Sequence, residues 1–196
     1  RDCKKLMPIL HLPIQSGSSY ILKKMNRNHS QEEYFKILDK LLKVNPSMKF
    51  SSDFIIAYPG ETQDDFEKTI SLIKKVKFIN SYSYIYSERP GTPAAKLKKI
   101  DKDVAKKRLV KFQVIADEIK KDYREKLVNS TVKVLFENQT KSENSYFGRD
   151  EYFNSVVVKS DSNLCGLIKD VKINDWTHNT LFGELYDTLE PKEFAA

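Results

Sequence analysis

The feature that most constrains the fold is a strand–loop–helix unit that occurs three times in the first two thirds of the chain. Apolar runs over residues 7–13, 49–57 and 81–86 are typical of strands. Segments with apolar residues at helical spacing follow them, over residues 18–25 and 30–44, then 62–76, then 101–126. Strands that alternate with helices predict an α/β fold with a parallel sheet and helical crossovers.

Three such units make half of a βα barrel rather than a closed one. The edge of a sheet of this size is exposed unless another segment covers it. We therefore expect the natural chain to be longer than these 196 residues.

The pattern changes after residue 126. Short apolar stretches over residues 130–136, 156–158, 164–173 and 181–186 are separated by turns rich in Ser, Asp and Asn. This spacing predicts a small antiparallel β-barrel. The expected domains are a partial barrel over residues 1–126, a β-barrel over 127–190 and a tail over 191–196.

Charge divides between the same two parts. Residues 1–125 contain 26 Lys and Arg against 16 Asp and Glu, a balance of +10, whereas residues 126–196 contain 8 against 11, a balance of −3. A basic body suits a polyanion such as RNA. However, 28 of the 34 basic residues are lysines, which are also typical of an ordinary solvated surface.

Cysteine content and hydropathy exclude a chain that binds an iron–sulfur cluster by itself and a chain that spans a membrane. Cys3 and Cys165 are the two cysteines, a number typical of a reducing cytoplasm and too small to bind a cubane iron–sulfur cluster. No apolar run approaches the roughly 18 residues of a membrane span, so we expect no membrane partner.

Polar residues gather where the predicted strands end, which is where parallel α/β proteins bind ligands. After the first strand, His11, Gln15 and Ser16 offer an imidazole, an amide and a hydroxyl beside Gly17, which lets a ligand approach the backbone. The alternative is a buried strand with a hydrogen-bonded histidine and a glycine turn.

Four charged residues near the other strand ends are further candidates. Asp53 and Glu61 flank the turn after the second strand, although an acid at a helix N-terminus is favoured without any function. Arg27 follows the first helix, and Arg89 lies in the loop after the third strand. An arginine there pairs with a carboxylate or phosphate, or only stabilises the loop. The pattern predicts packing for three tyrosines on one strand face, Tyr82, Tyr84 and Tyr86.

Taken in order, these segments resemble the radical SAM methylthiotransferases. The matching runs are HLPIQSGS at residues 11–18, ILKKMNR at 21–27, SDFII at 52–56, YPGET at 58–62, DF at 65–66 and YSERPGTPAA at 86–95. The last part is similar to the TRAM domain of these enzymes through FGR at 147–149, LCG at 164–166 and VKI at 171–173.

The resemblance implies the C-terminal part of a radical SAM partial barrel followed by a TRAM domain. It implies methylthiolation of isopentenyl-adenosine next to the tRNA anticodon, with S-adenosylmethionine and two 4Fe-4S clusters as cofactors. The implied partners are the anticodon stem-loop and an electron donor such as flavodoxin or ferredoxin, and the implied location is cytoplasmic. By position, it assigns cofactor binding to Gln15, Ser16, Arg27, Asp53 and Glu61, and substrate positioning to His11 and Arg89.

Three departures from the family pattern matter. The Cys-x-x-x-Cys-x-x-Cys motif is absent, so the cluster ligands are expected outside this chain and the chain alone is expected to be inactive. Ala57 stands where the family usually has Gly, which costs about 1 kcal/mol or more if that residue has a positive φ. The TRAM-like part is net acidic.

Three other functions remain open. The first is that of a related methylthiotransferase, which acts on threonylcarbamoyl-adenosine in tRNA or on a ribosomal protein. The chain could instead be a cluster-free RNA-binding protein. The third alternative is an unrelated α/β domain followed by a β domain. In that case the order of the motifs would have arisen by chance.

Overall fold

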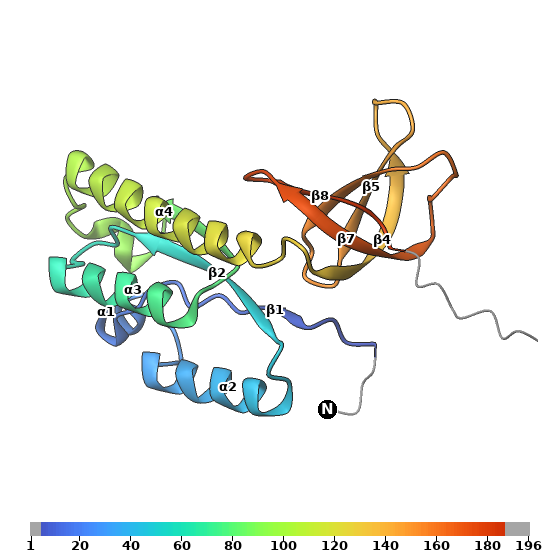
Figure 1. Ribbon diagram of the computed structural model, residues 1–196. Helices are drawn as coiled ribbons and strands as arrows, with labels where there is room; N and C mark the ends of the chain where they lie inside the picture. The colour runs from blue at the N-terminus through green and yellow to red at the C-terminus, as the bar shows by residue number, and fades with distance from the viewer. Residues whose placement is uncertain (1–4, 187–196) are drawn as a thin grey trace, which may run out of the picture. The chain divides into compact units, whose positions relative to one another are not determined.

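The computed structural model describes residues 5–186, and the chain divides after Lys120 into two compact units (Figure 1). Cys3, the end of the second domain at residue 190 and the expected tail over 191–196 lie outside the described residues. The domain boundary expected after residue 126 stays a prediction. Among the described residues, no helix has the length and apolar character needed to cross a membrane.

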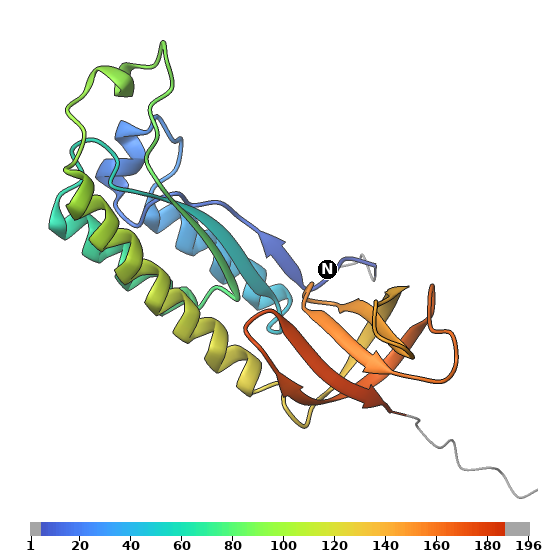
Figure 2. The same cartoon turned by 90° about the horizontal axis from the view of Figure 1, so that it is seen from above.

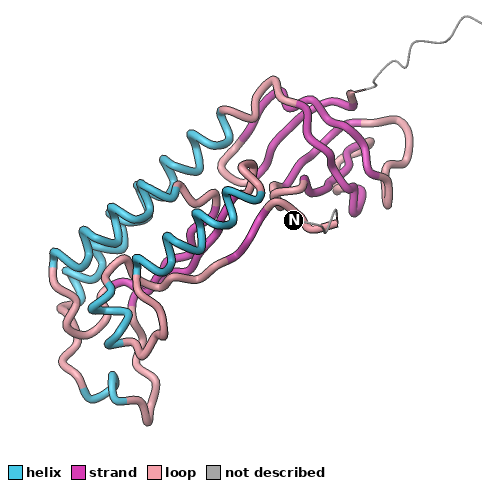
Figure 3. Tube along the Cα trace, turned by 90° about the horizontal axis from the view of Figure 1, so that it is seen from below, coloured by secondary structure: helices cyan, strands magenta, loops and turns pink. Residues whose placement is uncertain are grey.

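The first unit contains a three-stranded sheet in the order β1-β2-β3, and both strand pairs are parallel. The predicted α/β fold with helical crossovers is therefore confirmed (Figure 3). The elements are β1 (Ile9–His11), α1 (Ser19–Lys24), α2 (Gln31–Val44), β2 (Lys49–Ile56), α3 (Gln63–Val76), β3 (Asn80–Ile85), the 3-10 helix η1 (Pro93–Lys96) and α4 (Lys102–Glu125).

Side-chain caps fix where two of the crossover helices begin. The Ser30 hydroxyl accepts the Glu33 backbone N–H, and the Glu33 carboxylate accepts the Ser30 N–H, which makes a complete capping box for α2. Thr62 and Asp65 form the same arrangement at the start of α3. Each box satisfies backbone donors that a helix start leaves unpaired.

The core lies on the helix-facing side of the sheet. Phe50, Phe54 and Ile56 of β2 are buried against apolar residues of α2, α3 and α4. The Phe54 ring lies 4.7 Å from that of Phe112 on α4 and 5.6 Å from that of Phe78.

The opposite face of the sheet is more open. The predicted packing role of the tyrosines on β3 is wrong for two of them, because Tyr82 is 49% exposed and Tyr84 is 60% exposed.

The second unit is a closed five-stranded barrel in the order β4-β5-β6-β8-β7. A small barrel was predicted, but it is mixed rather than antiparallel, because β6 and β8 pair in parallel. The strands are β4 (Thr131–Gln139), β5 (Ser145–Asp150), β6 (Ser155–Lys159), β7 (Ile168–Trp176) and β8 (Thr180–Leu185).

The sequence pattern missed β5, and its inward residues explain why. Tyr146, Gly148 and Asp150 point into the barrel and are buried, but only the first is apolar. Gly148 is required because a Cβ there would lie 2.4 Å from the Leu135 carbonyl oxygen. Asp150 accepts hydrogen bonds from the Tyr152 and Asn154 backbone N–H groups and from the Asn154 side chain. Burial raises the pKa of the Asp150 carboxyl.

Candidate functional site

The three strands end at one edge of the sheet, because all of them run in the same direction. Gln15 extends this edge, since its backbone N–H donates to the Asp53 carbonyl and its carbonyl accepts the Ile55 N–H. Figure 2 shows α1 and the loop over residues 86–100 at this same end of the sheet. The strand ends therefore bring together the loops that the sequence singled out.

The loop after β1 is held rigidly against α3. Gly17 donates its backbone N–H to the Thr69 hydroxyl at 2.9 Å, and a Cβ on Gly17 would lie 2.5 Å from the Lys68 carbonyl oxygen. Ser16 is 1% exposed, and its hydroxyl accepts the Ser18 N–H at 3.2 Å. The Ser16 side chain therefore shapes the loop rather than facing solvent.

Ser18 connects the same loop to the capping box of α3. Its hydroxyl donates to Asp65 at 2.6 Å and accepts the Ile21 N–H, which caps α1. Burial disfavours the charged Asp65 carboxylate, but the hydrogen bonds from Ser18 and Thr62 outweigh that effect and lower its pKa. One carboxylate thus fixes the starts of both α1 and α3.

Two residues at the strand ends have left-handed backbone conformations although neither is glycine. Gln15 has φ 75° and Ala57 has φ 61°. The positive φ on which the cost at Ala57 depends is therefore present. Such conformations are unfavourable for residues with a Cβ and occur often in ligand sites.

Glu61 is anchored beneath the loop after β2. Its carboxylate lies 2.8 Å from the Arg108 guanidinium and accepts the Ala57 N–H at 3.0 Å. The Glu61 side chain is 1% exposed and that of Arg108 is 9% exposed. Burial raises the pKa of the Glu61 carboxyl, and the Arg108 charge opposes that shift. This geometry favours a positioning role for Glu61.

His11, Ser51 and Asp53 form a polar cluster across β1 and β2. The His11 Nδ1 lies 2.9 Å from the Ser51 hydroxyl, and the His11 Nε2 lies 3.4 Å from the Asp53 carboxylate. The His11 ring also contacts the Tyr82 ring edge to face, with 6.2 Å between centroids. The histidine is hydrogen-bonded but not buried, since its side chain is 46% exposed.

The two candidate arginines, Arg27 and Arg89, are exposed. Hydrogen bonds in their segments involve backbone carbonyl groups. The Tyr58 hydroxyl donates to the Lys24 carbonyl at 2.9 Å, which joins the end of α1, three residues before Arg27, to the loop after β2. The Arg89 carbonyl accepts the Thr92 hydroxyl within the loop after β3.

Tyr86 leaves a polar atom without a partner at this edge. Its ring packs against Tyr58 at 5.1 Å, and its hydroxyl is buried with no hydrogen-bond partner among the described residues. Buried polar groups are normally hydrogen-bonded, so an unpaired one at strand ends points to a ligand.

Sequence reasoning missed Arg108. A signal was present, because Arg108 lies midway between Val104 and Phe112 at four-residue spacing in the apolar stripe of α4. A charged residue at an inward position requires a buried partner.

The described residues contain no group of three or more His, Cys, Asp or Glu side chains placed to bind a metal ion. Cys165 is a free, exposed thiol. These residues therefore do not fit an iron–sulfur cluster, whereas the amide, hydroxyl and carboxylate groups at the strand ends fit a nucleotide-like ligand.

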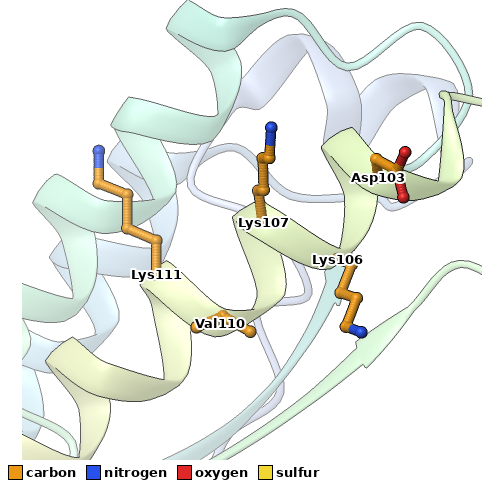
Figure 4. A pocket seen from close by; sticks show the side chains of 5 residues that line it. All are labelled: Asp103, Lys106, Lys107, Val110 and Lys111. Carbon is orange, nitrogen blue, oxygen red and sulfur yellow. The ribbon is translucent and has the colours of Figure 1, made fainter.

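A shallow depression on α4 is mainly basic, unlike the polar groups at the strand ends. It is lined by Asp103, Lys106, Lys107, Val110 and Lys111, and in Figure 4 Lys106 points to the opposite side of the helix from Lys107 and Lys111. Lys111 pairs with Glu67 of α3 at 2.6 Å.

Comparison with known proteins agrees with this architecture. The Radical SAM superfamily model matches residues 1–73, and the TRAM domain model matches residues 125–186. The chain therefore combines a segment similar to the radical SAM superfamily with a segment similar to the TRAM domain.

Three similar proteins share one name, tRNA-2-methylthio-N(6)-dimethylallyladenosine synthase. The protein of Pelagibacter ubique (strain HTCC1062) is 46% identical over 98% of this chain and 43% of its own length. Those of Orientia tsutsugamushi (strain Ikeda) and Rickettsia canadensis (strain McKiel) are each 43% identical over 93% of this chain and 41% of their length. The chain thus spans about two fifths of these relatives.

Proposed function

We propose that this chain is part of a radical SAM methylthiotransferase that modifies isopentenyl-adenosine next to the tRNA anticodon. The observation on which this chiefly rests is the similarity over nearly the whole chain to relatives named for 2-methylthio-N(6)-dimethylallyladenosine, the methylthiolated form of that nucleoside in tRNA. The combination of a radical SAM segment with a TRAM domain supports the same reaction.

The strand-end site is the proposed S-adenosylmethionine site. Gln15, Arg27 and Asp53 contact the cofactor, and the partly exposed Asp53 carboxylate suits hydroxyl or ammonium groups of that molecule. Ser16 and Glu61 act by fixing the loops, which their burial and hydrogen bonds support.

His11 and Arg89 are the proposed substrate-positioning residues. His11 is oriented by Ser51 and Asp53 on an open face of the sheet. Arg89 presents a guanidinium that suits a phosphate of the RNA backbone.

Two 4Fe-4S clusters, with electrons from flavodoxin or ferredoxin, would supply radical generation and sulfur in the complete enzyme. Their ligands are proposed to come from sequence outside this chain, so that this fragment alone is inactive. The chain's own residues bind and orient S-adenosylmethionine and the adenosine, in a cytoplasmic reaction without a membrane partner.

The TRAM barrel is the proposed second contact with the tRNA anticodon stem-loop. On its outer face, the Arg149 guanidinium lies 5.3 Å from the Phe147 ring centroid. Arginine and aromatic groups of this kind bind RNA by charge and by stacking, although Arg149 also pairs with Glu137 at 3.2 Å.

The test is to express the complete gene that encodes this chain in bacteria that lack methylthiolated tRNA. Mass spectrometry of tRNA nucleosides should then detect 2-methylthio-isopentenyladenosine. A methylthiolated threonylcarbamoyl-adenosine or ribosomal protein would indicate the related enzymes instead. RNA binding without any methylthiolated product would support the cluster-free RNA-binding alternative.

Binding measurements on the chain itself test the residue assignments. S-adenosylhomocysteine is a stable probe for titration calorimetry. Gln15→Ala and Asp53→Asn should each weaken its binding about tenfold, the loss expected for one or two hydrogen bonds. Unchanged affinity in both variants would rule out their assigned role.

A further inference from the structure

Two tyrosines of β3 present their rings to solvent on the side of the sheet opposite its buried apolar core. Tyr82 is 49% exposed and Tyr84 is 60% exposed. Tyr82 pairs with Asp53 and Tyr84 pairs with Ile55 in the parallel register, so their rings lie on the side opposite the core residue Phe54. We call this side, with Tyr82, Tyr84 and His11, the tyrosine face.

The chemistry of the tyrosine face differs from that of a packing surface. Parallel sheets are usually covered by apolar residues on both faces. Here Ile55 shares the side with the hydroxyl, carboxylate, imidazole and phenol groups of Ser51, Asp53, His11 and the tyrosines. The His11 ring lies against Tyr82 at 6.2 Å between centroids, so the two rings form a continuous aromatic surface.

The next tyrosine on the same side of the strand adds an independent observation. Tyr86 follows Tyr84 by two residues, and its buried hydroxyl has no hydrogen-bond partner within residues 5–186. An unpaired hydroxyl beside exposed rings indicates a ligand with both a flat ring and hydrogen-bonding groups.

The outer edge of β3 is hollowed next to these rings. A cavity of about 320 Å³ is lined by Ser81, Tyr82, Ser83 and Tyr84 of β3 and by Gln113, Ala116 and Asp117 of α4. Among the described strands, β3 is the last in the sheet. A large molecule can therefore insert one group into this cavity from the outer edge of β3.

We propose that the tyrosine face receives one unpaired adenine base of an RNA, stacked on Tyr82 and Tyr84 and bordered by His11. This inference rests on the proposed function and deepens it by naming residues that hold the substrate base. Aromatic side chains stack on unpaired RNA bases in this way. RNA is favoured as the source of the base because residues 1–125 have a charge balance of +10.

The test uses the full chain and an anticodon stem-loop RNA with 2-aminopurine at the adenosine next to the anticodon. The fluorescence of 2-aminopurine reports stacking of that base, and the titration also gives the affinity. Tyr82→Ala and Tyr84→Ala should remove the fluorescence change and weaken binding about tenfold. Tyr84→Phe should retain both, because the ring remains.

The matched control is Tyr20→Ala, which removes a tyrosine of similar exposure, 56%, from α1. It should behave like the unchanged chain, and circular dichroism checks that each variant is folded. The inference is overturned if both alanine variants bind RNA with an unchanged fluorescence signal, a result that leaves the proposed function intact. It is also overturned if they lose only S-adenosylhomocysteine binding, which would assign the face to the cofactor. Failure of the unchanged chain to bind this RNA would count against both proposals.

Discussion

The Glu61 carboxylate and the Arg108 guanidinium form a buried ion pair at 2.8 Å between the loop after β2 and helix α4. The same carboxylate accepts the backbone N–H of Ala57, and the same guanidinium donates to the Glu61 carbonyl at 3.0 Å. This pair fixes the loop that closes the end of the central strand. The contribution of this ion pair to stability and the contribution of the loop after β1 can be tested separately.

Removing one member of the pair should cost more than removing both. Glu61→Gln leaves a buried, uncompensated guanidinium and should lower the free energy of unfolding by about 3–5 kcal/mol. The double variant Glu61→Gln/Arg108→Met should cost less than the sum of the single changes. Urea denaturation of the four proteins measures this coupling.

The control for this cycle is Glu67→Gln, which breaks the exposed pair of Glu67 on α3 and Lys111 on α4. It should cost less than about 1 kcal/mol. Strict additivity of the Glu61 and Arg108 changes would contradict the coupling.

Ala57→Gly should stabilise the chain. At φ 61° a Cβ costs about 1–2 kcal/mol, which exceeds the roughly 0.5–1 kcal/mol that glycine loses through its greater freedom when unfolded. The expected gain is about 0.5–1 kcal/mol in thermal or urea unfolding. Ala116→Gly, within α4, should instead destabilise by about 1 kcal/mol. A loss of stability in both variants would disprove the strain at Ala57.

Gly17→Ala should displace the loop after β1 from α3. The added Cβ would meet backbone atoms of Lys68 and Thr69 at 2.5–2.6 Å, so the backbone itself must move. We expect a loss of about 1–3 kcal/mol of stability and weaker S-adenosylhomocysteine binding. Gly91→Ala is the control: nothing lies within 4 Å of its Cβ position, so only its positive φ is penalised. Equal stability losses in the two variants would contradict this close contact.

Asp65 should make the chain less stable in acid. Its pKa is lowered in the folded state, so its contribution is complete above the ordinary aspartate value of about 3.9 and is lost as the pH falls through the folded-state pKa. Asp65→Asn should lower stability at neutral pH and flatten the acid dependence below about pH 5. Asp64→Asn, which changes only an exposed pair with Lys68, should keep the dependence of the unchanged chain. Urea unfolding at several pH values measures both, and parallel curves for all three proteins would be inconsistent with this role.

The sequence alone determined the order of elements in the first unit, because hydrophobic periodicity, capping residues and turn residues are local signals. Alternating strands and helices also determined that the strand ends share one edge. Local signals failed at β5, where Gly148 is fixed by close contact with β4 and Asp150 by hydrogen bonds to the turn that follows.

Only the tertiary structure decided what each candidate residue contacts. Glu61 pairs with Arg108, which lies 47 residues away, and this partner is invisible to any local pattern. The exposure of Tyr82 and Tyr84 was decided in the same way, because an alternating strand does not reveal which of its faces other elements cover. Periodicity determines that a face exists, whereas packing between distant segments determines what that face meets.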